Sequence, residues 1–498
     1  MPDKNMYQDY ADHMRKIADV KFALAVLQWD QETYLPPKGA AFRGQQMATL
    51  SEISHQMFTD EKLGKLLDQL SNDPSLNEKQ RRNIELTSED YNKNQKYSSA
   101  FVRKLSEATS KSYHSWIEAR KQNDFKVFEK DLSVLVDLKK EETQLLGFKQ
   151  HPYDALLNEF EKGATVQWLD GLFGNLREPL KKLLEKIQGK SAPDDSFLHQ
   201  HFNKDDQWKF GIDMLKQMGF DFEAGRQDIS EHPFTTNFSA EDVRVTTRID
   251  ENDFTSMTWS CLHEGGHALY EQGLPTDQYG LPLGEYCSLG IHESQSRLWE
   301  NCVGRSMEFM QHNFPLMLQY FPQLKNVGAE QVYAAVNKVQ PSLIRTESDE
   351  LTYHFHVMIR YEVEKQLIDG TLAVKDIPGF WNEKYKTYLG VNVPDDKRGC
   401  LQDIHWSHGS FGYFPTYSLG SLYAAQFFKH IQKKYPGLTA LINKGNYNDI
   451  HQWLQTNVYQ YGRMYTSGEL CNKATGETLQ QSYLLAYLTD KYAGIYGF

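Results

Sequence analysis

The chain has 498 residues, with 54 Lys and Arg against 66 Asp and Glu, and its formal net charge is −12. With 40% hydrophobic and 13% aromatic residues it can bury a large core, which excludes a disordered chain. The acidic balance argues against nucleic acid as the main partner, because phosphate binding needs clustered Lys and Arg. It also opposes binding to an anionic membrane surface.

No segment is typical of export or membrane insertion. Residues 1–16, MPDKNMYQDYADHMRK, are charged and contain no apolar stretch, so we expect no signal peptide. The best apolar run, 22–27, is too short to cross a bilayer. The five cysteines are few, odd in number and widely spaced, which argues against a disulfide framework. We therefore expect a cytoplasmic protein with no membrane partner.

Most of the chain is predicted to be helical, because apolar residues recur at three- and four-residue spacing with charges between them. The segments with this pattern are 11–27, 78–97, 101–121, 125–146, 167–187, 453–465 and 480–492. Length alone suggests about three domains. No repeat, low-complexity tract or long linker divides the sequence, however, so we predict a single domain over 1–498.

A short β-element is predicted in DVRVTTRID (242–250), where polar residues alternate with Val243 and Val245. This two-residue period gives a strand one polar and one apolar face. If the strand lies at a sheet edge, it could bind a substrate backbone as an added strand.

The motif His263-Glu264-Gly265-Gly266-His267 predicts a metal site just downstream of this element. In a helix, positions i and i+4 share a face, so both imidazoles can bind one ion. Glu264 then lies beside the ion and can hold a water. The alternative is a pair of core or surface histidines on an ordinary helix.

Local signals mark the ends of this helix. Ser256 or Thr258 can cap its start, Gly273 suits its end, and Pro275 prevents continuation. The two glycines of the motif weaken a helix by about 1 kcal/mol each. They could admit a neighbouring helix or the substrate close to the backbone.

A catalytic zinc site needs three protein ligands and an open position. The candidate third ligand is Glu293, 26 residues after His267 in a second predicted helix. On spacing alone, Glu293 could instead form an ion pair with Arg297 at i, i+4. His292 and Glu300 are rival ligands nearby.

This ligand set predicts a reaction. A metal would lower the pKa of its water and polarise a carbonyl, while Glu264 would take the proton and return it to the leaving amine. The sequence therefore predicts hydrolysis of a peptide or amide bond.

Further motifs stand along the chain in order: WDQET at 29–33 with PP at 36–37, HPF at 232–234, Asp-x-Arg-x-Thr at 242–246, HEGGH at 263–267, HESQ at 292–295, IRTE at 344–347 with DELTY at 349–353, and GxxQDxHW at 399–406. With these motifs the chain resembles the carboxypeptidase Taq family of metallocarboxypeptidases nearly from end to end. One departure is Ser348, where the family pattern has Ala; a single added hydroxyl casts little doubt on activity.

The resemblance implies that Glu293 is the third ligand beside His263 and His267. It implies a mainly helical, saddle-shaped fold with a deep groove and a small β-sheet near the active site, similar to neurolysin and angiotensin-converting enzyme. It further implies a homodimer, one Zn²⁺ or Co²⁺ ion, and removal of single residues from peptide C-termini with broad preference that disfavours proline.

A carboxypeptidase must recognise a terminal carboxylate, and the guanidinium fork of Arg suits this task. Arg345 and Arg244 are the candidates, and we prefer Arg345. The alternative for Arg345 is a salt bridge to Glu347, to Asp349 or to a carboxylate of the groove. Arg244 shares a strand face with Asp242, so an intramolecular pair is an equal alternative there.

The segment HWSHGSFGYFPTYSLG, from His405, is dense in His, Tyr and Gly. A neutral imidazole and a phenol could donate hydrogen bonds to the oxyanion that forms on the attacked carbonyl. The spacing of His405 and Tyr417 resembles that of the neurolysin group. His408 and Tyr413 are rivals, and the alternative for each is packing within a loop.

Two other functions remain open. An oligopeptidase that cuts internal bonds would use the same metal site, and cleavage of a C-terminally amidated peptide distinguishes it. A non-catalytic metal- or peptide-binding protein is disfavoured, because such a protein could dispense with Glu264.

Overall fold

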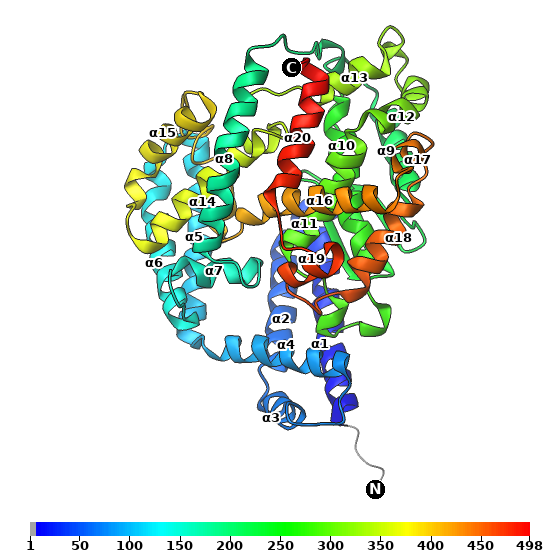
Figure 1. The fold of residues 1–498 in the computed structure, drawn as a ribbon. Coiled ribbons are helices and arrows are strands. Elements are labelled where there is room, and N and C mark those ends of the chain that lie inside the picture. Colours follow the sequence, from blue (N-terminus) through cyan, green and yellow to red (C-terminus); the bar gives the residue numbers. More distant parts are fainter. Residues whose placement is uncertain (1–5) are drawn as a thin grey trace. The chain divides into compact units, whose positions relative to one another are not determined.

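The computed structural model describes residues 6–498; residues 1–5, which belong to the segment 1–16 considered above, lie outside the described part. The fold is mainly helical with one small sheet, which confirms the predicted class (Figure 1). The chain forms two compact units, each assembled from three separate segments. Unit 1 comprises the chain up to residue 95, 194–336 and 426–478, and unit 2 comprises 96–193, 337–425 and 479–498.

Unit 1 carries the predicted metal motif and the sheet. Its elements are α1 (Met6–Thr33), α2 (Ala40–Phe58), α3 (Glu61–Leu70), α4 (Glu78–Gln95), α9 (Lys204–Met218), β1 (Gly225–Ile229), β2 (Thr235–Ser239), β3 (Asp242–Thr247), α10 (Phe254–Gln272), α11 (Leu289–Arg297), a π-helical turn (Leu298–Gly304), α12 (Met307–Tyr320), α13 (Ala329–Val336), α17 (Leu438–Ile442), α18 (Asn448–Asn457) and α19 (Ser467–Thr475).

Unit 2 carries Arg345 and the predicted His–Tyr segment, whereas Arg244 lies in unit 1. Its elements are α5 (Ser99–Gln122), α6 (Lys126–Leu146), α7 (Tyr153–Phe160), α8 (Val166–Gln188), α14 (Tyr353–Asp369), α15 (Ile377–Leu389) and α20 (Gln481–Tyr496). Short 3₁₀ turns at Arg345–Glu347 and His405–His408 hold two of its motifs, and α16 (Pro415–Lys434) begins in this unit and ends in unit 1. Helices α8 and α20 pack side by side (Figure 1).

The predicted β-element is β3, and it is the central strand of three in the order β1-β3-β2. It pairs parallel with β1 and antiparallel with β2. Val243 and Val245 are buried, as the alternation predicts. A substrate strand could add to β3 only if β3 were an edge strand of the sheet, and β3 is the central strand. The edge strands are β1 and β2, which were not predicted. Both are short and partly polar, so they carry a weak periodic signal.

Helix α10 begins one turn earlier than either predicted cap. The side chain of Asp253 accepts a hydrogen bond from the amide of Thr255, so Asp253 is the N-cap in place of Ser256 or Thr258. The helix ends at Gln272, beside the predicted terminator Gly273. A Cβ atom at position 273 would overlap the ring of Tyr459, which explains the glycine there.

The predicted helix over 453–465 is only half correct. Helix α18 ends at Asn457, and the chain then makes a 3₁₀ turn at Tyr459–Tyr461. Gly462 follows with φ of 48°, a left-handed conformation that interrupts any helix. Its backbone packs against the carbonyl of Leu283, a distant segment, so sequence periodicity does not register the break.

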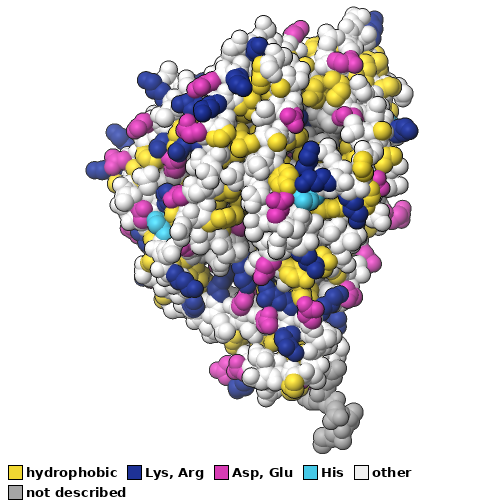
Figure 2. Space-filling view, viewed as in Figure 1, with side chains coloured by type: hydrophobic (Ala, Val, Ile, Leu, Met, Phe, Trp, Pro, Cys, Tyr) yellow, Lys and Arg dark blue, Asp and Glu magenta, His cyan; other side chains and the backbone are white. Residues whose placement is uncertain are grey.

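Among residues 6–498, no helix combines the length and the apolar character that crossing a bilayer requires. On the face shown in Figure 2, acidic and basic side chains are interspersed. The net charge of −12 is therefore not concentrated in one acidic field on that face.

Candidate metal centre

Close packing of α10 against its neighbours explains the two glycines of the HEGGH motif. A Cβ atom on Gly266 would lie 2.6 Å from the carbonyl oxygen of Gln295 and 2.7 Å from Cα of Ser296, both in α11. A Cβ atom on Gly265 would lie 2.8 Å from side-chain atoms of Leu215 and Met218 in α9. Of the two predicted reasons for these glycines, the neighbouring helix is the one the structure shows.

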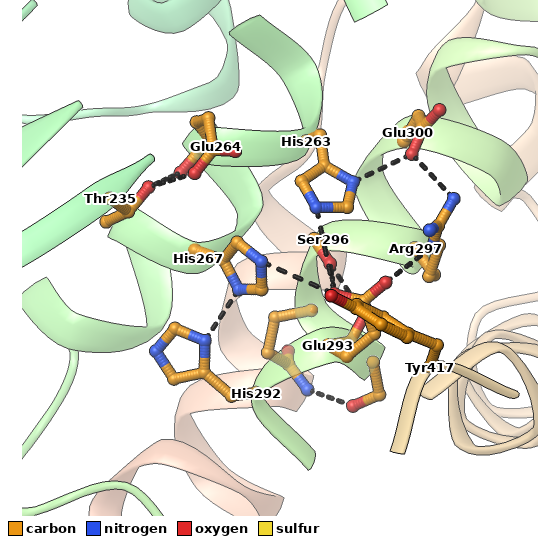
Figure 3. Close-up of polar contacts among 12 residues, drawn as sticks. Thr235, His263, Glu264, His267, His292, Glu293, Ser296, Arg297, Glu300 and Tyr417 are labelled. Carbon is orange, nitrogen blue, oxygen red and sulfur yellow. Dashed lines mark hydrogen bonds and ion pairs between the residues drawn. The ribbon is translucent and has the colours of Figure 1, made fainter. Parts of the chain in front are cut away.

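This packing brings three candidate ligands together (Figure 3). Oε2 of Glu293 lies 3.5 Å from Nε2 of His267 and 3.7 Å from Nε2 of His263. The three donor atoms all lie within 4.8 Å of one another, and among the described residues they form a group able to hold a metal ion. Two imidazole nitrogens and one carboxylate oxygen are the donor set of catalytic zinc sites that keep an open position.

The rival candidates, His292 and Glu300, lie behind the two histidines of this group and bind their Nδ1 atoms. Glu300 accepts a hydrogen bond at 2.8 Å from Nδ1 of His263. His292 places its Nδ1 2.6 Å from Nδ1 of His267, and its Nε2 2.7 Å from Glu271. Each rival therefore contacts a histidine of the group of three instead of joining that group.

These outer contacts decide which nitrogen each histidine offers. Because Glu271 accepts the Nε2–H of His292, the Nδ1 of His292 is left to accept the Nδ1–H of His267. With Nδ1 of His267 on His292 and Nδ1 of His263 on Glu300, the Nε2 atom of each ring is the one that faces Glu293. Burial and the neighbouring His292 lower the pKa of His267 to about 3, which keeps it neutral.

Glu264 lies beside the group and is buried. The hydroxyl of Thr235, the first residue of β2, lies 2.6 Å from Oε2 of Glu264 and 3.0 Å from its main-chain oxygen (Figure 3). Burial raises the pKa of Glu264 above its ordinary value, and His263 and Thr235 oppose that rise. Its acidity is thus shifted toward that of a group that both takes and returns a proton near neutral pH.

Glu293 also forms the ion pair with Arg297 that the sequence offered as the alternative to metal binding. Nε of Arg297 donates to Oε1 of Glu293 at 2.7 Å, while Oε2 faces the two histidines. Burial alone would raise the pKa of Glu293, but Arg297 and His263 hold it well below its usual range. The ion pair and the position facing the histidines therefore coexist.

In unit 2, His405 and Tyr417 meet. Nε2 of His405 lies 3.1 Å from the hydroxyl of Tyr417. Burial lowers the pKa of His405 to about 3, so its imidazole is neutral, as a donor to an oxyanion requires. The rival His408 is exposed and packs on Tyr113, and the rival Tyr413 lies against His405 with ring centroids 5.2 Å apart.

Arg345 is buried in unit 2. Its Nε donates to Asp403 at 2.9 Å, and its Nη1 donates to the hydroxyl of Tyr353 at 3.1 Å. Arg345 therefore forms a salt bridge, as the alternative expected, and the carboxylate is Asp403, not the sequence neighbours Glu347 and Asp349 that the alternative named beside a carboxylate of the groove. Asp403 also binds Arg360, a fully buried guanidinium.

Arg244 in unit 1 makes the intramolecular pair that its strand position predicts. It donates twice to Asp242, at 3.0 Å from both Nε and Nη2. Its guanidinium carbon also lies 4.3 Å from the centre of the Trp29 ring. Trp29 belongs to the WDQET motif, so two distant motifs meet at this arginine.

Known proteins resemble this chain over almost its whole length. The family model described as carboxypeptidase Taq (M32) metallopeptidase matches residues 9–492. The chain belongs to this family. It is 39% identical to thermostable carboxypeptidase 1 of Thermus thermophilus over 511 aligned positions, covering all of both chains. The solved M32 carboxypeptidase of Deinococcus radiodurans matches with 40% identity and a TM-score of 0.98, covering 99% of this chain and 100% of that one. The solved protein CHT matches with 59% identity and a TM-score of 0.96, covering 99% of both.

As an M32 metallopeptidase the chain is a metal-dependent peptide hydrolase of the carboxypeptidase type, which confirms the predicted family and reaction. Membership implies a divalent metal ion, and the donors of His263, His267 and Glu293 suit one.

Sequence reasoning gave no role to Thr235 or Glu271 of this M32 chain. Glu271 follows His267 by four residues, so helical spacing could have placed it on the same face. Its partner His292 comes from α11, and that contact needs the tertiary structure. Thr235 reaches Glu264 from a separate strand, and only its position directly after the HPF motif could have drawn attention to it.

Proposed function

We propose that this M32 metallopeptidase removes single amino acids from peptide C-termini, with broad side-chain preference and with proline disfavoured. The observation that carries the proposal is the convergence of His263, His267 and Glu293 beside the buried carboxyl group of Glu264. The range of substrates comes from the family resemblance alone.

Zn²⁺ is the metal we propose for the site, with Co²⁺ as the alternative. His263, His267 and Glu293 would hold it, and three protein ligands leave one position open for substrate or water. When bound, such an ion supplies Lewis acidity to the scissile carbonyl and lowers the pKa of a water.

In the proposed reaction, the carboxylate of Glu264 takes a proton from the attacking water and then gives it to the leaving amine. Thr235 supports both states of Glu264. Its hydroxyl can donate to Oε2 of the carboxylate, and it can turn to the main-chain oxygen when that carboxyl group holds a proton.

We propose that Arg345 binds the terminal carboxylate of the substrate, with Arg244 as the second candidate. Asp403 and Tyr353 occupy Nε and Nη1 of Arg345, so a carboxylate would meet Nη2. Arg244 donates to Asp242 through Nε and Nη2, one edge of its guanidinium, so a carboxylate would meet Nη1 there.

We also propose that His405 and Tyr417 stabilise the oxyanion. Their direct contact supports the pair over the exposed His408. Neutral donors fixed in advance stabilise a developing negative charge without reorganisation during the reaction.

Three further expectations stand as proposals. A single catalytic domain over 1–498 is supported by a family model that spans both units. A homodimer rests on the resemblance, and light scattering should give twice the chain mass of 57.8 kDa. A cytoplasmic location rests on the scattered cysteines, and cell fractionation tests it.

The decisive experiment is mass spectrometry of peptides incubated with the metal-loaded enzyme. A ladder of products that shorten by one residue from the C-terminus supports the proposal, and a penultimate or terminal proline should slow it. A matched peptide with a C-terminal amide should resist cleavage. Equal cleavage of the amide, or internal cuts, would show an oligopeptidase instead.

A further inference from the structure

Arg297 contacts one metal-ligand candidate directly, Glu293, and a second, His263, through Glu300. It lies in the last turn of α11, four residues after Glu293 and three before Glu300. Its Nε donates to Oε1 of Glu293 at 2.7 Å, and its Nη1 donates to Oε2 of Glu300 at 3.2 Å (Figure 3). Its side chain is only 15% exposed, so both contacts are shielded from water.

Because of the first contact, the two oxygens of the Glu293 carboxylate have different partners. Oε1 is held by Arg297, whereas Oε2 faces Nε2 of both His263 and His267. The hydroxyl of Ser296 lies 3.1 Å from Oε2 and on the same side of the carboxylate as the histidines. For Oε1 to turn toward a metal ion as well, it would have to give up a short charge-assisted hydrogen bond.

The second contact reaches another ligand through Glu300. Oε2 of Glu300 accepts from Arg297 and also from Nδ1 of His263, at 2.8 Å. The orientation of the His263 ring therefore depends on a carboxylate that Arg297 holds in place. The π-helical turn at Leu298–Gly304 carries Glu300, directly after the helix that carries Arg297.

We propose that Arg297 is a positioning residue that restricts Glu293 to ligation through a single oxygen. This inference rests on the proposed metal site at His263, His267 and Glu293. A second carboxylate oxygen on the ion would occupy the position that a catalytic site keeps open for water or substrate. Arg297 thus protects the open position, which is a different task from strengthening metal binding.

A lysine at position 297 should not fulfil the role of Arg297. An ammonium group is a point donor, whereas the guanidinium fork reaches two carboxylates from fixed directions. Metal affinity is a poor criterion, because removing a nearby positive charge favours cation binding while lost ligand orientation opposes it. Coordination number is the quantity that the proposal fixes.

The test uses Co²⁺ bound to the full-length chain after chelation, with the visible d–d absorption as the readout. Four-coordinate Co²⁺ absorbs strongly and five-coordinate Co²⁺ weakly. The wild type should give the strong spectrum, and R297M should fall to about half of its intensity or less at full metal loading, because a fifth donor joins the ion. R297K should resemble R297M.

The matched control is R305M. Arg305 donates to Glu300 at 3.2 Å and to the main-chain oxygen of Val336 at 2.6 Å; R305M leaves the Arg297–Glu293 contact in place, so this variant should keep the strong spectrum. Spectra of R297M and R297K that superimpose on the wild type at full loading would overturn the proposal. If R297M does not fold, R297K decides by the same criterion. If the wild type binds no Co²⁺, or H263A keeps the wild-type spectrum, the metal site itself fails and not only the role of Arg297.

Discussion

Gly266 of α10 packs directly on the main chain of Gln295 in α11, with space for a hydrogen atom and none for a methyl group. This contact sets the separation between the helix that carries both histidines and the helix that carries Glu293. A methyl group there would meet backbone atoms, which cannot move aside as a flexible side chain can.

The first prediction follows from that contact. G266A should destabilise the protein by about 2 kcal/mol or more, because overpacking against backbone forces α10 and α11 apart. Thermal unfolding measures the effect. The matched control is G174A in α8, where a Cβ atom meets nothing within 4 Å, so this change should stabilise by about 0.5–1 kcal/mol. Equal behaviour of the two variants would contradict the packing argument.

E264Q should abolish turnover and leave metal content unchanged. The amide cannot take a proton from water, while it can still accept the hydrogen bond from Thr235. Loss of a general base lowers the rate by roughly 10²–10⁴-fold. Metal analysis and peptide hydrolysis are measured on the same sample, and hydrolysis at the wild-type rate would exclude Glu264 as the base.

The metal content of variants should distinguish the metal ligands from the residues that hold those ligands in place. E293A should lose the metal, because two histidines alone make an incomplete site. E271Q, which alters the partner of His292, should weaken binding by roughly 10–100-fold without abolishing it. Competition with a chromogenic chelator measures both. Full metal content in E293A would place the third ligand elsewhere, with His292 as the next candidate.

H405A and Y417F should each lower kcat by roughly 10²-fold or more with a smaller effect on KM, because an oxyanion forms only in the transition state. H408A is the control, since His408 is exposed and its ring lies against Tyr113 of α5. If H408A is as slow as H405A, the assignment of the imidazole donor is wrong.

A pH dependence of stability should arise at Glu364 in unit 2. This buried carboxyl group accepts hydrogen bonds from Tyr153, Trp406 and Gly412. Burial raises its pKa from 4.5 to about 7, against those hydrogen bonds. The folded state thus binds more protons than the unfolded state between these values, so stability falls as pH rises from about 4.5 to 7.

E364Q removes this titration. The stability of the wild type relative to E364Q should therefore be greater at pH 5 than at pH 8, by up to about 3 kcal/mol. Unfolding of both proteins across this pH range measures the difference, in which the titration of all other groups cancels. A difference that stays constant with pH would show that Glu364 is ionised throughout.

Much of the fold and the site can be predicted from the sequence because the signals are local. The i, i+4 spacing of His263 and His267 fixes their common face whatever surrounds the helix. The apolar periodicity of 78–97 or 125–146 likewise reflects a helix with one buried face. The alternation at Val243 and Val245 identifies the central strand for the same reason.

Tertiary structure decided everything that depends on two distant segments meeting. Glu293 could be ligand or ion-pair partner by sequence, and only the packing of α11 on Gly266 shows that one oxygen contacts Arg297 while the other faces the histidines. The carboxylate that Arg345 binds is Asp403, 58 residues away in the sequence, and not a near neighbour such as Glu347. Sequence spacing alone cannot identify a partner at that distance. Local spacing determines which side chains share a face of one element, whereas contacts between elements follow from how their surfaces pack.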